Sequence, residues 1–103
     1  MLPRRLRGLP VAARCGGLTI LEASSPRARL LGLALLREPP LGIALHFPRC
    51  RSIHTFGMRF PIDVAFLDER GRTVRTERMV RPGRGLICRE ARAVLEVARP
   101  PAG

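Results

Sequence analysis

The stretch CRSIHTFGMRFPIDVAFLD, residues 50–68, decides the fold of this 103-residue chain. It predicts two β-strands, at residues 52–56 and 62–67, joined by a bend around Gly57. Pro61 lacks the N–H that a strand needs to donate to its neighbour, so it marks the start of the second strand. Alternate residues of that strand face opposite sides of a sheet, and one side is wholly apolar. The centre of the chain therefore predicts β structure.

The flanking residues predict more short strands and one helix. Asp68 and Gly71 occupy the first and fourth positions of a type I turn, which closes a hairpin onto residues 73–80. Ser25 is a good N-cap and a proline follows it, so a short, largely buried helix is expected over residues 26–36. Further strands are expected at residues 18–23, 41–47, 86–89 and 93–97.

The length bounds the architecture, because a chain of this size builds one modest core. We predict a mainly β fold, a β-sandwich or half-barrel, with one short helix in its N-terminal half, as a compact single domain. The expected divisions are a basic flexible tail (1–16), the β-rich domain (17–98) and a disordered C-terminal end (99–103). No apolar run reaches the length of a membrane span, and the N-terminal run is too short for export, so a cytoplasmic location is expected.

The net charge of +11 comes entirely from arginine, since all nineteen basic residues are Arg. They are spread along the chain: residues 1–51 carry nine Arg against two Glu, and residues 52–103 carry ten Arg against six acidic residues. We favour a solvated basic shell, with nucleic-acid binding as an alternative. Arg81, Arg84 and Arg89 are a possible phosphate grip, but an ordinary exposed loop is favoured because aromatic residues for base stacking are few.

The central stretch has a recognisable relative. The run from Cys50 to Asp68 resembles the signature of the bacterial and archaeal family called domain of unknown function 192. The resemblance covers about residues 18–98 and includes Arg29 with Gly32-Leu33, Gly71-Arg72, Pro82 and Val94-Leu95-Glu96. It implies a compact β-sandwich or half-barrel with a short helix, and it implies no particular activity.

The chain departs from that family after its last expected strand. Members usually continue through a turn of small residues into a further helix-like stretch and strand, whereas this chain stops at Gly103. We therefore expect either a sheet without a closing strand or a truncated chain.

His54 and Asp63 are the first candidates for a functional pair. If their strands are neighbours, the carboxylate holds the imidazole in one tautomer near neutral pH. A buried polar pair with a purely structural role is the alternative. Cys50, Thr55 and Met58 complete the expected binding face, although core filling is the favoured role for Met58.

Two other kinds of site would share some of these residues: a catalytic triad and a metal site. Cys50, His54 and Asp63 could act as nucleophile, base and orienting group, but an extended chain separates Cys50 from His54 by about 13 Å. His46, Cys50 and His54 have the spacing of a ligand ladder on a helix, which Pro48 disfavours. We therefore expect neither a catalytic triad nor a metal site.

The three cysteines, Cys15, Cys50 and Cys88, are too few and too far apart for a disulfide scaffold. Free thiols are expected, with a Cys50–Cys88 bridge as the alternative. The favoured function is a non-enzymatic accessory module that binds a small ligand or a protein partner through the central segment. A small Cys/His/Asp enzyme and an Arg-rich nucleic-acid-binding protein are the alternatives. No cofactor is expected, and the oligomeric state is left open.

Overall fold

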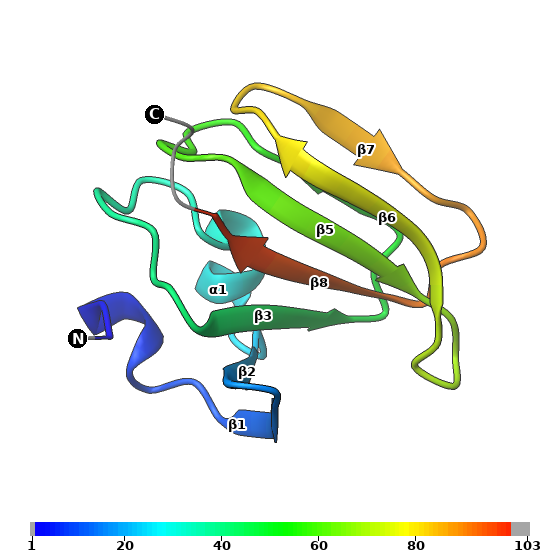
Figure 1. Ribbon diagram of the computed structural model, residues 1–103, viewed down its shortest axis with the longest axis horizontal. Helices are drawn as coiled ribbons and strands as arrows, with labels where there is room; N and C mark the ends of the chain where they lie inside the picture. The colour runs from blue at the N-terminus through cyan, green and yellow to red at the C-terminus, as the bar shows by residue number, and fades with distance from the viewer. Residues whose placement is uncertain (1, 100–103) are drawn as a thin grey trace.

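The larger of two sheets has six strands in the order β1-β2-β3-β8-β5-β6 (Figure 1). The computed structural model describes residues 2–99. The strands are β1 (Val11–Cys15), β2 (Leu18–Glu22), β3 (Ile43–Pro48), β4 (Ser52–His54), β5 (Ile62–Leu67), β6 (Thr73–Val80), β7 (Gly85–Ile87) and β8 (Ala93–Ala98). One α-helix, α1 (Pro26–Leu31), and a 3₁₀ turn, Arg4–Leu6, complete the elements. The predicted mainly β fold with one short helix in the N-terminal half is confirmed.

Strand β8 lies at the centre of the sheet, paired antiparallel with β3 on one edge and with β5 on the other. Among the paired strands of residues 2–99, β2 and β3 alone run parallel to each other. Strands β4 and β7 form a separate two-stranded sheet. The inward residues of β5, Ile62, Val64 and Phe66, are completely buried, which confirms the alternation that the sequence predicted.

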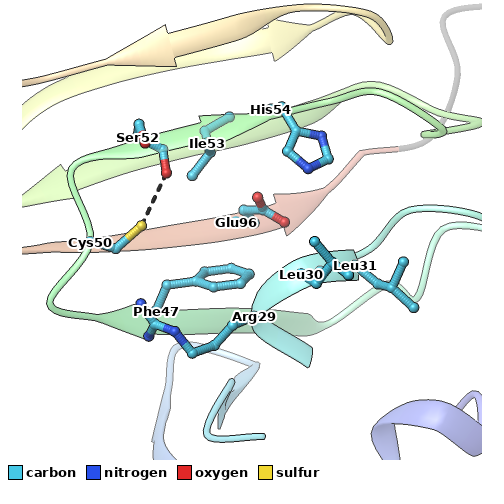
Figure 2. A pocket seen from close by; sticks show the side chains of 10 residues that line it. Arg29, Leu30, Leu31, Phe47, Cys50, Ser52, Ile53, His54 and Glu96 are labelled. Atoms are coloured by element: carbon cyan, nitrogen blue, oxygen red, sulfur yellow. Dashed lines mark hydrogen bonds between the residues drawn. The ribbon is translucent and has the colours of Figure 1, made fainter. Parts of the chain in front are cut away.

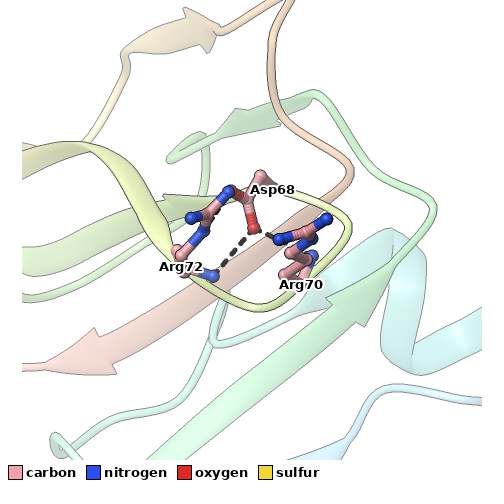
Figure 3. Close-up of polar contacts among 3 residues, drawn as sticks. All are labelled: Asp68, Arg70 and Arg72. Carbon is pink, nitrogen blue, oxygen red and sulfur yellow. Dashed lines mark hydrogen bonds and ion pairs between the residues drawn. The ribbon is translucent and has the colours of Figure 1, made fainter.

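The hairpin between β5 and β6 closes on the side chain of Asp68 (Figure 3). Its Oδ1 accepts hydrogen bonds from the backbone N–H groups of Arg70 and Arg72, each at 2.9 Å. The Arg72 side chain donates from Nε to Oδ2 at 3.0 Å. The backbone hydrogen bond from Arg72 is the largest cause of a lowered pKa at Asp68. The backbone N–H of Gly71 donates to the carbonyl oxygen of Asp68 at 3.0 Å, so the predicted turn over residues 68–71 is confirmed.

Helix α1 begins as predicted and ends earlier. The Oγ of Ser25 accepts a hydrogen bond at 3.0 Å from the backbone N–H three residues on. The helix stops at Gly32, which adopts φ 52° instead of continuing the predicted element to residue 36. Leu33 is fully buried in the turn that follows, whereas Leu30 is 70% exposed. The prediction of a largely buried helix over residues 26–36 is therefore wrong in its extent and in its burial, since Ala28 is the buried residue of α1.

The N-terminal segment differs from the predicted flexible tail at residues 1–16. Strand β1 pairs with β2, and Leu6 is 1% exposed within the core. Arg5 donates from Nη2 to the carbonyl oxygen of Gly32 at 2.7 Å. Of the predicted C-terminal end, 99–103, only Arg99 lies within the described residues. No helix in residues 2–99 is long and apolar enough to cross a membrane.

Thr55 connects the segment after β4 to the loop before β7. Its side chain is completely buried. The hydroxyl donates to the carbonyl oxygen of Arg81 at 2.6 Å and accepts from the backbone N–H of Arg84 at 2.8 Å. The backbone N–H of Thr55 also donates to the Arg84 carbonyl oxygen at 2.8 Å. These bonds give Thr55 a structural role.

We predict that Thr55→Val lowers the free energy of unfolding by roughly 1 to 3 kcal/mol, because the isosteric side chain leaves the Arg84 N–H without its acceptor. Thr55→Ser keeps the hydroxyl and serves as the matched control. Urea denaturation of the variants measures the difference. A Val variant as stable as the Ser variant would contradict this role.

Candidate functional site

His54 and Asp63 lie apart. Strand β4, which carries His54, pairs with β7 and not with β5, which carries Asp63. Asp63 instead accepts a hydrogen bond at 2.9 Å from the backbone N–H of Met79, and its Oδ2 lies 3.5 Å from Nε of Arg99. The Nδ1 of His54 accepts from the backbone N–H of Phe56 at 3.2 Å. The predicted contact between the imidazole and the carboxylate is therefore not made.

The other residues of the predicted binding face have different locations. Thr55 and Met58 are buried, at 0% and 6% exposure, and both belong to the interior. Cys50 and His54 line one pocket together. The structure thus brings together two of the five predicted residues.

Neither of the alternative chemical clusters is assembled. His54 and Asp63 are hydrogen-bonded to different backbone groups, so the orienting contact of a Cys50–His54–Asp63 triad is not made. His46 is paired with Glu22. Within residues 2–99, no group of three or more His, Cys, Asp or Glu side chains is arranged to hold a metal ion. Cys15, Cys50 and Cys88 are all free thiols.

A small pocket opens between α1, β3, β4 and β8, and the carboxyl group of Glu96 belongs to its wall (Figure 2). We call it the Glu96 pocket. It measures about 60 Å³ and is lined by Arg29, Leu30, Leu31, Gly32, Phe47, Cys50, Ser52, Ile53, His54 and Glu96. Figure 2 shows the carboxyl group between the residues of β4 and those of α1.

The position of Glu96 in the sheet explains its burial. It shares the inward face of β8 with Val94, and its register partners are Leu45 on β3 and Val64 on β5, both completely buried. Because β8 is bonded on both edges, the side chain cannot bend around an open edge to reach solvent. The backbone of Gly32 packs closely against this carboxyl group, because a Cβ at that position would lie 2.9 Å from Oε1 of Glu96.

The carboxyl group of Glu96 is only partly satisfied. It is 3% exposed, and its Oε1 has no hydrogen-bond partner. Burial raises the pKa of Glu96 to about 8, although a backbone hydrogen bond from Leu33 acts in the opposite direction. At pH 7 the group is therefore mostly a neutral acid, which both donates and accepts hydrogen bonds.

Three polar side chains line the pocket together with this acid. The ring of His54 is exposed and stacks on Phe56, with centroids 5.6 Å apart. Because its Nδ1 accepts a backbone hydrogen bond, the neutral ring carries its proton on Nε2. The thiol of Cys50 donates to the carbonyl oxygen of Ser52 at 3.0 Å (Figure 2). The guanidinium of Arg29 donates to the carbonyl oxygen of Pro48 at 2.8 Å.

The sequence predicts a strand at Glu96 and includes it in the family resemblance, but does not predict it as a site residue. A signal was present, because AVLEVA puts a single ionisable residue among apolar ones on the same side as Val94. That pattern indicates a buried carboxyl group only if the strand has partners on both edges and its Glu96 face is packed against the core. The unusual burial and raised pKa now make Glu96 the leading candidate for function.

Stability should fall with rising pH because of Glu96. Its pKa is about 8 in the folded protein and near the ordinary value of 4.5 in the unfolded chain, so the folded state holds the extra proton between these values. The stabilisation is complete below pH 4.5 and is lost as the pH rises to about 8, by about 4 kcal/mol. Urea denaturation across this range should show a flatter dependence for Glu96→Gln than for the wild type. Glu38→Gln, an exposed control, should leave the slope unchanged, and parallel curves for the wild type and Glu96→Gln would contradict the assignment.

Comparison with known proteins agrees with the fold and the motif. No curated protein matches the chain. A Sinorhizobium meliloti crystal structure, described as a candidate transcription regulator, is similar at 23% identity and TM-score 0.69, covering 79% of this chain and 68% of its own. A protein of unknown function from Novosphingobium aromaticivorans is similar at 18% identity and TM-score 0.68, covering 86% and 71%. The model of the DUF192 family, described as "Uncharacterized ACR", matches residues 12–101, so the chain belongs to that family.

Proposed function

We propose that this protein is a non-enzymatic binding module, and that it holds the polar end of a small ligand in the Glu96 pocket. One observation carries the proposal: Oε1 of Glu96 is buried in the wall of an open pocket and has no hydrogen-bond partner. Leaving such a group unpaired costs about 1–3 kcal/mol. A ligand that supplies the missing hydrogen bond recovers part of that cost.

The dimensions of the pocket restrict what enters it. Ligand sites for whole drug-sized molecules usually measure about 300–1,000 Å³. The Glu96 pocket, at about 60 Å³, exceeds the space of one water but accommodates only an end group. The rest of the ligand then lies across the mouth, where the exposed Leu30 and the stacked rings of His54 and Phe56 offer apolar surface.

The chemistry of the wall favours a neutral polar end group. A protonated Glu96 pairs well with a hydroxyl or a primary amide, because each of these groups both donates and accepts hydrogen bonds. An ammonium group would need the ionised carboxylate, and it would enter against a net charge of +11. A hydroxyl- or amide-bearing ligand is therefore the best match.

An enzymatic role has less support. A nucleophilic cysteine needs a base within hydrogen-bond reach, and the thiol of Cys50 donates instead to the backbone of Ser52. The nitrogen of His54 that accepts a hydrogen bond is engaged by Phe56. These contacts give no support to covalent chemistry.

A screen of small polyols and primary amides by ligand-observed NMR tests the proposal. Compounds that bind the wild type should bind Glu96→Gln with similar affinity, because Gln preserves the donor and the acceptor. Glu96→Ala should weaken the same compounds about five- to tenfold, the value of one hydrogen bond.

Glu38→Ala is the matched control and should bind like the wild type. Two results would contradict the proposal: that no compound binds, or that binding persists unchanged in Glu96→Ala. If compounds bind more tightly above pH 8, and if Glu96→Gln abolishes that binding, the ligand carries an ammonium group and not a neutral end group.

A further inference from the structure

A second pocket lies beside the loop that joins β3 to β4. It measures about 520 Å³ and is lined by Arg49, Cys50, Arg51, Glu69 and Arg92. It shares only Cys50 with the Glu96 pocket, and three of its five lining residues are arginines. We call it the arginine pocket. Its size falls within the usual range for small-molecule sites.

Two of its guanidinium groups converge on one atom. The Nε of Arg51 donates to the carbonyl oxygen of Ala91 at 3.3 Å, and Nη1 of Arg92 donates to the same oxygen at 2.9 Å. Two positive charges are therefore held near each other, which is unfavourable without a negative partner. Each guanidinium retains further N–H groups that this carbonyl does not use.

The backbone around these arginines is held in place by hydrogen bonds between segments distant in the sequence. The N–H of Cys50 donates to the carbonyl oxygen of Arg92 at 3.2 Å, and the N–H of Arg92 donates to that of Leu67 at 2.7 Å. The N–H of Cys88 donates to the carbonyl oxygen of Arg51 at 2.8 Å. The backbone of both converging arginines is therefore hydrogen-bonded to neighbouring segments.

Arg49 adds a third positive charge from a strained position. It adopts φ 50°, in the left-handed region that residues other than glycine seldom occupy. Such strain persists only where the surrounding structure enforces it, and it is frequent at binding sites. In residues 2–99, none of the three arginines forms an ion pair. The only carboxylate in the lining is that of Glu69, which is exposed.

We propose that the arginine pocket binds an oxyanion of a small molecule, a phosphate or a carboxylate group, between Arg51 and Arg92 with Arg49 at its side. Guanidinium forks match the geometry of both anions and form two parallel hydrogen bonds to each. An anion placed there neutralises the two converging charges. This site is independent of the proposed function of the Glu96 pocket.

Calorimetric titration of the full chain with inorganic phosphate, and separately with acetate, tests the proposal at low ionic strength. We expect saturable binding of one anion per chain. The probe with the higher affinity shows whether the site prefers a phosphate or a carboxylate group. Arg51→Gln with Arg92→Gln should weaken binding about tenfold or more. Arg14→Gln with Arg37→Gln, two exposed arginines outside the pocket lining, lowers the net charge equally and should change affinity within about twofold.

A second pair of variants acts in the opposite direction. Glu69→Gln should tighten anion binding because it removes the competing carboxylate, whereas Glu38→Gln should have a smaller effect. This comparison remains informative even if the double arginine variant fails to fold. Equal losses in both double arginine variants, or no saturable binding, would overturn the proposal. Binding of a single-stranded oligonucleotide that inorganic phosphate cannot displace would also overturn it, in favour of a nucleic-acid surface.

Discussion

The insertion of β8 between β3 and β5 is the constraint on which the rest of the structure depends. It joins strands β1 to β3 to the β5–β6 hairpin. Without β8 these two groups of strands would not belong to one sheet. The inward side chains of β8 are buried. Two of these, Val94 and Ala98, are apolar, and the third is Glu96. A centre built from non-local pairs also makes folding depend on contacts between distant parts of the chain.

Both pockets follow from that insertion. The Glu96 pocket lies where α1 ends at Gly32, whose missing side chain lets the backbone approach the carboxyl group closely. The arginine pocket exists because the segment entering β8 is hydrogen-bonded to the loop after β3. Cys50 lines both pockets and therefore lies at the junction of the two candidate sites.

The arginine content has a structural use beyond surface charge. Eight acidic residues cannot pair with nineteen arginines, and several guanidinium groups donate to backbone carbonyl oxygens instead. Arg5 donates to Gly32, and Arg29 donates to Pro48, so each connects segments distant in the sequence. A guanidinium suits this role because its planar fork offers several donors in fixed directions. Arg51 and Arg92 differ from these two, since they share one carbonyl oxygen.

Local features of the fold were predictable from the sequence alone. The Asp68–Gly71 turn, the Ser25 N-cap and the alternation in β5 depend on neighbouring residues, and the structure confirms all three. The central motif also identified the family. Only the tertiary structure decided that β4 pairs with β7, which separates His54 from Asp63, and that Glu96 is buried on a central strand. Strand partners and burial depend on contacts between residues far apart in the chain, and a local pattern does not specify which distant segments will meet.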